Sequence, residues 1–173
     1  MMDTDKHWYV AYVKSCRERV VAASLGALGY QYYLPVQRVV RRWSDRRKIV
    51  ERLVLPRMIF IRCAEKDRIR PLDEIDALYR YITVSGPYTP AVVRDVEMET
   101  FIRMVEHGGR DVTMTGDALA PGDNVRVVSG PLTGLECELI SVKGRRCLAV
   151  RLGMLGTATM DLATDDVQKI EKK

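Results

Sequence analysis

The chain has 173 residues, of which 47% are apolar and 29% are charged, and its formal net charge at pH 7 is +5. This length suits one domain or two small ones, and the composition excludes a largely disordered protein. No run of about 18 apolar residues occurs, which excludes a helical membrane span. The polar, acidic N-terminus is unlike a signal peptide. We therefore expect a cytoplasmic protein that makes no contact with membranes.

The two halves of the chain differ in charge and in aromatic content. Residues 1–110 hold 20 Lys and Arg against 14 Asp and Glu, a net charge of +6, whereas residues 111–173 hold 8 against 9, a net charge of −1. All 12 aromatic residues lie between Trp8 and Phe101. Two parts of such different composition argue for two domains.

The sequence carries no signature of an enzyme or of a bound cofactor. Its four cysteines form no C-x-x-C pair and it has only two histidines, so neither a zinc site nor any other metal site is expected. We expect the cysteines to be buried, reduced thiols. The Gly-x-Ser-x-Gly, His-Glu-x-x-His and Gly-x-Gly-x-x-Gly motifs are all missing. The pattern therefore predicts a binding protein rather than a catalyst.

The first predicted elements are a strand, a helix and a second strand. Aromatic and β-branched residues over 8–13 predict the first strand. Ser15 and Glu18 have the spacing of a capping box, which predicts a helix that runs to about residue 28. Gly29 ends that helix, and residues 30–36 form the next strand.

A basic hairpin and a buried strand follow. Two apolar pairs flank a polar tip near residues 44–45, which predicts a hairpin over 38–53. Pro56 belongs at a strand's start because it cannot donate to a sheet, and residues 58–62 then form a strand covered on both faces. The remaining elements of this half are a helix over 72–78, a strand over 80–84, a loop over 86–90 and a helix over 96–106 capped by Asp95.

The C-terminal part is predicted to be a small β domain. Residues 108–119 are polar and rich in glycine, which indicates a flexible linker. Five short strands follow, separated by turn signals, and this spacing is typical of a small β-barrel; they cover 124–128, 135–142, 147–152, 157–162 and 167–170. We therefore predict an α+β protein with domains over 6–107 and 120–173.

An apolar group next to Pro56 is the first candidate binding site. Leu55 and Met58 lie where a strand would leave its sheet, and an apolar group there is either core or a docking surface. Tyr9, Tyr12 and Tyr33 could line the same surface, although each could equally be a core ring.

A cluster of cations is the second candidate site. Such a patch is typical of proteins that contact phosphates, although each cation alone could belong to a solvated face. Trp43, at the hairpin tip, could stack on a base or be a half-buried ring. The cations are Lys14, Arg17, Arg41, Arg42, Arg46, Arg47 and Lys48.

Several segments together resemble the NusG family of transcription elongation factors. In the first half they are 8–10, 33–36, 55–61 and 90–93, and in the second half 121–127, 155–162 and 167–170. The second half is similar to a KOW motif, whose matching residues are Gly122, Asp123, Val125, Val127, Gly130, Pro131 and Gly134. The basic hairpin resembles the specialised RfaH-like and UpxY-like branch more than a housekeeping factor.

The resemblance implies a fold and a set of partners. It implies an N-terminal α/β sandwich of the NGN type, with an antiparallel sheet and flanking helices, joined to an SH3-like KOW barrel. It implies that Leu55, Pro56, Met58 and the three tyrosines bind the clamp helices of the largest RNA polymerase subunit. It also implies that the cations and Trp43 contact non-template DNA of the transcription bubble.

The implied activity is suppression of pausing and termination, specific to certain operons and in particular to those of the polysaccharide type, by a monomeric factor. The second half has no aromatic ring on which a base could stack, so we expect it to bind a protein rather than RNA. The resemblance suggests a ribosomal protein of the small subunit, Rho, or neither as that partner. The alternative is an RNA-binding protein linked to translation, whose KOW domain grips ribosomal RNA.

Overall fold

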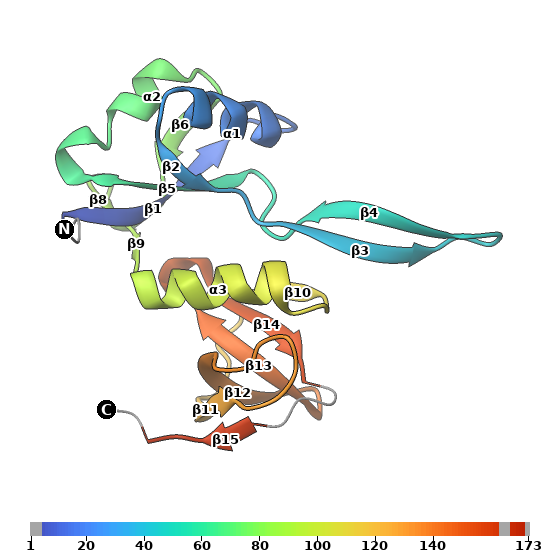
Figure 1. Cartoon of the computed structure of the whole chain (residues 1–173). Coiled ribbons are helices and arrows are strands. Elements are labelled where there is room, and N and C mark those ends of the chain that lie inside the picture. Colours follow the sequence, from blue (N-terminus) through green and yellow to red (C-terminus); the bar gives the residue numbers. More distant parts are fainter. Residues whose placement is uncertain (1–4, 163–166, 172–173) are drawn as a thin grey trace. The chain divides into compact units, whose positions relative to one another are not determined.

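A computed structural model describes residues 5–162 and 167–171 (Figure 1). The chain divides into two compact units, one formed by Met1–Pro35 with Leu55–Asp95 and the other by Val36–Val54 with Val96–Lys173. In the described part of the chain, no helix combines the length and the apolar character needed to cross a membrane. The fold is a mixed one, with several sheets and few helices.

The first unit is built on an antiparallel sheet. Its strand order is β2-β5-β1-β6, and β9 pairs with β1 beyond the end of β6. The paired segments are β1 (Lys6–Val13), β2 (Gln31–Tyr33), β5 (Met58–Ala64), β6 (Leu78–Tyr81) and β9 (Val92–Val93). The strand predicted over 58–62 is confirmed as a central one, because β5 lies between β2 and β1.

Two helices cover one face of this sheet. Helix α1 (Glu18–Ala27) buries Val21 and Leu25 in a cluster with Tyr9 and Ile59 of the sheet, and α2 (Arg70–Glu74) follows the short 3-10 turn Glu65–Asp67. The predicted loop over 86–90 is the turn of a small ribbon, in which β7 (Thr83–Ser85) pairs with β8 (Thr89–Pro90).

Three local predictions in this unit are wrong. Ser15 does not cap α1, whose N-cap is Arg17 and has no side-chain cap bond. Glu18 instead accepts a hydrogen bond of 2.9 Å from the backbone N–H of Arg57, whose φ is +63°. The helix predicted over 72–78 ends at Glu74, because Leu78 is already paired in β6. Cys16 is exposed, in contrast to the buried thiols expected from the composition.

The second unit contains a long hairpin and the last helix. Strands β3 (Val36–Arg42) and β4 (Arg47–Leu53) pair over seven residues, which confirms the predicted hairpin and extends it by two residues at its start. The four-residue tip is closed by a 2.8 Å hydrogen bond from the Trp43 N–H to the Arg46 carbonyl. Helix α3 (Asp95–His107) matches the prediction to within one residue.

The rest of the second unit is a six-stranded antiparallel sheet of order β10-β14-β13-β12-β11-β15. The five predicted strands are all present, and a short 3-10 turn (Gly153–Leu155) precedes β14. The strands are β10 (Val112–Thr115), β11 (Asp123–Val127), β12 (Glu136–Val142), β13 (Arg145–Arg151), β14 (Thr157–Asp161) and β15 (Val167–Lys169).

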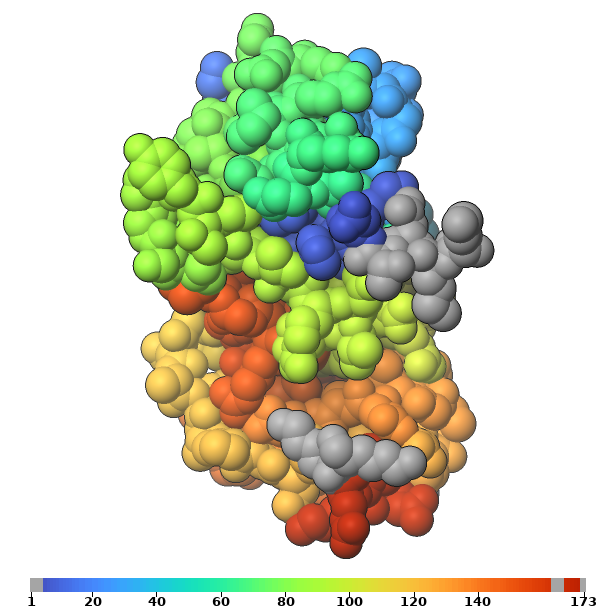
Figure 2. Space-filling view, turned by 90° about the vertical axis from the view of Figure 1, so that its left-hand side faces the viewer, coloured from blue at the N-terminus to red at the C-terminus, as the bar shows by residue number. Residues whose placement is uncertain are grey.

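Helix α3 lies against this sheet and its turns. The Thr100 hydroxyl donates to the Glu136 carbonyl at 3.4 Å, and the Arg103 guanidinium donates to the Thr133 carbonyl at 3.1 Å. Figure 2 shows the yellow-green atoms of α3 in contact with the orange atoms of the sheet. A Cβ at Gly108 would overlap the backbone carbonyl of Met104 and the thioether of Met160, so a side chain there would strain the end of the helix.

The linker predicted over 108–119 is in part a strand. Residues Val112–Thr115 form β10 and pair with β14 in a regular antiparallel register. This strand could not be predicted from its own polar, glycine-containing sequence. Its pairing partner, β14, lies more than 40 residues further along the chain. Two expectations stay predictions: the closure of the six strands into an SH3-like barrel, and the domain limits 6–107 and 120–173. Residue 173 lies outside the described residues.

Gly122 lies where the chain passes too close to a neighbouring strand for a side chain to fit. A Cβ at this position would overlap the backbone carbonyl of Leu139 on β12. We expect Gly122→Ala to lower the free energy of unfolding by about 1–3 kcal/mol, because the Leu139 carbonyl is a backbone group and cannot rotate away. Gly116→Ala is the matched control, since nothing lies within 4 Å of its Cβ. Urea denaturation measures both, and equal midpoints for the two variants would contradict the proposed collision.

Candidate functional site

The hairpin β3–β4 presents most of the predicted cations. Arg41, Arg42, Arg46, Arg47 and Lys48 are all exposed on it. Their positions follow from the register, in which Arg41 pairs with Lys48 and Arg42 pairs with Arg47. Because opposite residues of an antiparallel pair share a face and neighbours along a strand alternate, these two pairs lie on opposite faces of the ribbon.

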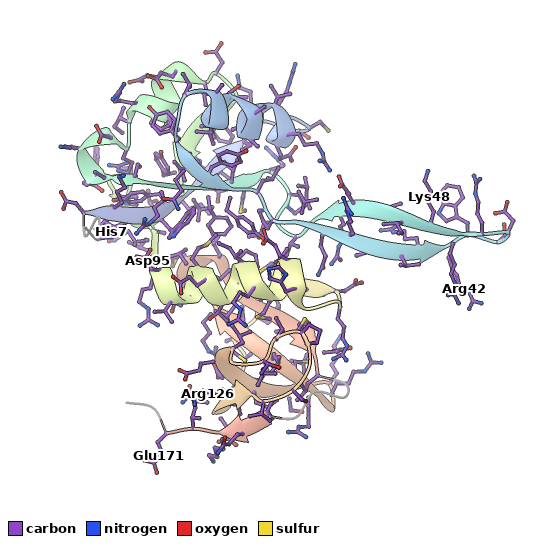
Figure 3. All side chains as sticks on the ribbon, in the orientation of Figure 1. His7, Arg42, Lys48, Asp95, Arg126 and Glu171 are labelled. Atoms are coloured by element: carbon purple, nitrogen blue, oxygen red, sulfur yellow. The ribbon has the colours of Figure 1, made fainter. Side chains whose placement is uncertain are left out.

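Figure 3 shows Lys48 and Arg42 pointing to opposite sides of the hairpin, as the register requires. The Lys48 ammonium lies 6.0 Å from the centre of the Trp43 ring, which is 57% exposed. An exposed cation–π contact of this kind is worth about 0.5–1 kcal/mol. The tip therefore combines one aromatic ring with closely spaced positive charges.

The inner end of the hairpin is fixed by a buried glutamine. The Gln37 side-chain amide donates to the Arg110 carbonyl at 2.6 Å and its oxygen accepts the Val112 N–H at 2.8 Å. The guanidinium of Arg52, which is opposite Gln37, donates to the Val112 carbonyl at 2.8 Å. Gln37 is only 5% exposed, so these bonds form away from water and hold the hairpin to Arg110 and to the first residue of β10.

Lys14 and Arg17 belong to a different unit from the hairpin cations. Both are exposed and lie just before α1 in the first unit, whereas the hairpin belongs to the second. The seven predicted cations therefore do not form one cluster within either unit.

The predicted polymerase-binding residues divide between the two faces of the first sheet. Tyr12 of β1 is directly opposite Met58 of β5 and Arg80 of β6, so these three share a face. Tyr33 of β2 lies on the same face, because it is opposite Phe60, which is two residues after Met58 on β5. The ring centres of Tyr33 and Phe60 are 6.3 Å apart. Tyr9 lies on the other face, which α1 covers.

Exposure further divides this group. Pro56 is exposed and Met58, Tyr12 and Tyr33 are half-buried, but Leu55 is only 7% exposed. The expectation that Leu55 presents an apolar side chain to a partner is therefore not met in this structure. A buried leucine instead contributes to the packing, so a polar substitution there would destabilise the fold and could not report on binding alone.

Arg80 is a neighbour of this surface that sequence reasoning missed. Its guanidinium carbon lies 4.9 Å from the centre of the Tyr12 ring, and the ring of Tyr79 stacks on Tyr12 with centres 5.8 Å apart. We call Tyr12, Tyr33, Met58 and Arg80 the Tyr12–Met58 face. The pairing of β1 with β6 brings Arg80 next to Tyr12, and no short motif indicates it.

Gln37 and Glu18 were missed for a related reason. Each is a polar residue that is buried and bonds to a backbone group far along the chain, at Val112 and Arg57 respectively. The one available signal for Gln37 is its position two residues before the apolar Val39, on the same face of a strand.

The residues that resemble a KOW motif lie in β11 and in the turns on either side of it. Val125 and Val127 are buried in β11, and the Asp123 carboxylate forms a 2.9 Å ion pair with Lys169. Gly130 and Gly134 both have φ of +85° in the turn before β12, where L side chains are strained, and Pro131 lies between them. Within residues 5–162 and 167–171, no group of three or more His, Cys, Asp or Glu could hold a metal ion.

Comparison with known proteins assigns the family. The sequence model described as "Transcription termination factor nusG" matches residues 6–102, which is more than half of the chain. The chain therefore belongs to the NusG family, which is a family of transcription factors rather than of enzymes. No curated protein matches it significantly.

Two solved structures are similar to the whole chain. One, described as "Domain interaction in Thermotoga maritima NusG", has 19% identity and a TM-score of 0.47, over 97% of this chain and 99% of that one. The other is from the "MjSpt4:Spt5 complex conformation B", with 13% identity and a TM-score of 0.31, over 96% of this chain and 99% of that one. The family assignment rests on the sequence match.

The hydroxyl of Tyr9 makes a hydrogen bond within the fold. The Tyr9 hydroxyl donates to Glu65 at 2.6 Å, and this bond, with the nearby Arg68, lowers the pKa of the Glu65 carboxyl. Burial, and then the same bond, raise the pKa of Tyr9. Because the ionised form of Glu65 is favoured in the folded state, this contribution is present at neutral pH and is lost as the pH falls through the lowered pKa.

We expect Tyr9→Phe to lower the free energy of unfolding by about 1 kcal/mol at neutral pH, since it removes one hydrogen bond and keeps the ring. The difference from the parent protein should shrink below the ordinary Glu pKa of 4.5. Urea denaturation at several pH values measures it, with Tyr88→Phe as the control because Tyr88 is 87% exposed. A loss that does not vary with pH would exclude the Glu65 bond as its cause.

Proposed function

We propose that this NusG-family chain is a transcription elongation and antitermination factor. It binds the clamp helices of the largest RNA polymerase subunit, contacts non-template DNA of the transcription bubble, and suppresses pausing and termination. The observation that carries the proposal is the family match over residues 6–102, which spans both the Tyr12–Met58 face and the cationic hairpin.

The Tyr12–Met58 face, with exposed Pro56, is a better candidate for the polymerase contact than the buried Leu55 and Tyr9. It combines half-buried aromatic and thioether groups with the Arg80 guanidinium, and aromatic residues, Met and Arg are enriched at protein interfaces. Leu55 and Tyr9 act instead as core residues that support it. A methionine suits this role because its side chain adapts to the shape of a partner.

Two contacts on one factor account for the effect on pausing. A factor held to polymerase through one surface brings its hairpin to a high effective concentration near DNA, so that even weak phosphate contacts become occupied. Simultaneous binding to the clamp and to DNA would keep the enzyme closed around nucleic acid. All of the bond chemistry belongs to the polymerase.

The C-terminal sheet suits a protein partner, either a ribosomal protein or Rho. Residues 111–173 contain no aromatic ring and have a net charge of −1, so they offer neither a stacking platform nor a basic surface for RNA. The alternative function, RNA binding linked to translation, requires such a surface on this sheet. Membership of a family of transcription factors favours the first function.

We also propose action at specific operons, because the cationic hairpin offers DNA contacts in addition to the polymerase contact. The polysaccharide type of operon follows from the resemblance of this hairpin to the specialised branch. We further propose that the protein acts as a monomer in the cytoplasm.

Met58→Asp tests the polymerase contact. A buried interface anchor contributes about 2 kcal/mol, so we expect polymerase to bind this variant about 30-fold more weakly, with a matching loss of pause suppression. Titration against the elongation complex and a single-round elongation assay measure the two effects. Met154→Asp is the control, because Met154 is 61% exposed and lies in the other unit. A folded Met58→Asp protein that binds and acts like the parent protein would overturn the proposed surface.

A further inference from the structure

We propose that the outer part of the hairpin, residues 40–49, binds in the major groove of B-form duplex DNA. This inference rests on the proposed function and deepens it, because it names the form of nucleic acid that the hairpin takes. In this proposal the hairpin binds duplex DNA, whereas Lys14 and Arg17 make the proposed contact with the single non-template strand.

The outer ribbon is strongly positive. It holds five cations and one acid, Asp45, which gives a net charge of +4 over ten residues. Every one of these side chains is exposed, and the carboxylate of Glu51, 3.8 Å from the Arg38 guanidinium, lies outside this segment. This charge is therefore available to phosphates.

The cations lie on both faces of the ribbon, which favours two strands of phosphates over one. Arg41 and Lys48 project from one face and Arg42 and Arg47 from the other. A single strand that lay along one face would leave half of these charges unused. In a groove of a duplex, a ribbon is flanked by two phosphate backbones, and long side chains from both faces can reach them.

An exposed apolar pair completes the outer ribbon. Val40 and Ile49 are directly opposite each other and are 66% and 67% exposed. They share a face with Arg42 and Arg47. The thymine methyl group in the major groove is an apolar contact for such side chains. This face therefore carries an apolar pair that can contact base edges between arginines that reach the phosphates.

Dimensions also favour duplex DNA. The major groove of B-DNA, about 12 Å wide, admits a two-stranded β-ribbon, whereas the major groove of an A-form RNA helix is too narrow for side chains to read. Recognition of a single strand uses several stacked rings, but Trp43 is the only aromatic residue over 36–53.

The test is fluorescence anisotropy of the full chain with labelled DNA of about 20 base pairs, roughly two helical turns, and with the same sequence as single-stranded DNA and as duplex RNA. We expect duplex DNA to bind most tightly. Tighter binding of either the single strand or the RNA duplex would overturn the proposal.

Two double variants test the two faces separately: Arg41→Gln with Lys48→Gln, and Arg42→Gln with Arg47→Gln. Because each lost phosphate contact reduces the slope of log affinity against log salt by about 1, each double variant should reduce it by about 2. Arg145→Gln with Arg146→Gln is the charge-matched control on β13 and should leave it unchanged. A slope that changes for one face only, or for neither, would overturn the proposal.

Two further variants complete the test. The first shows whether a lost salt slope comes from misfolding or from lost contacts, and the second shows whether DNA binding is independent of polymerase binding. Arg42→Lys with Arg47→Lys keeps the charges and should retain the salt slope of the parent chain; its loss would contradict phosphate contact. Met58→Asp should bind duplex DNA normally while it loses polymerase. Normal polymerase binding by a parent chain with no preference for duplex DNA would reject the inference and leave the proposed function intact.

Discussion

The two hydrogen bonds made by the buried Gln37 side chain are the constraint on which the hairpin's role depends. An isolated two-stranded ribbon is only marginally stable in water. Here its inner end is tied to the backbone at Arg110 and Val112, and Arg52 adds a third bond from the opposite strand. Because unpaired polar groups are costly when buried, these bonds favour one position of the ribbon on its unit.

This anchoring divides the hairpin into two parts with different tasks. The inner part is buried on one face, where Val39 lies beside Gln37. The outer part retains its charges and its apolar pair in solvent. A ribbon fixed at one end loses less conformational freedom when it binds than a free one would, and such pre-organisation improves affinity.

Much of the fold was predictable because it is encoded locally. The alternation around the hairpin tip, the apolar face of α3 and the turn residues of the last five strands each specify their element from nearby residues. The errors have a common origin in distant contacts: Glu18 bonds to Arg57 rather than to its own helix, and β10 becomes a strand only because β14 pairs with it.

The candidate site was predictable in its charges and less so in its apolar part. A run of arginines on a hairpin stays exposed in most folds, so the cations were found from sequence. Whether Leu55 or Met58 faces solvent depends on the path of the chain before β5, which the Glu18 bond to Arg57 helps to set. Sequence alone offers no signal for that bond, and the same holds for the place of Arg80 beside Tyr12.

Amide hydrogen exchange at Val112 tests the anchoring most directly. In Gln37→Ala the Val112 N–H loses its acceptor, and we expect its exchange to become about tenfold faster or more, which corresponds to at least about 1.4 kcal/mol. Gln168→Ala, at an exposed position on β15, should leave it unchanged. Equal protection of Val112 in Gln37→Ala and in the parent protein would show that Gln37 does not hold the hairpin, and would contradict the account.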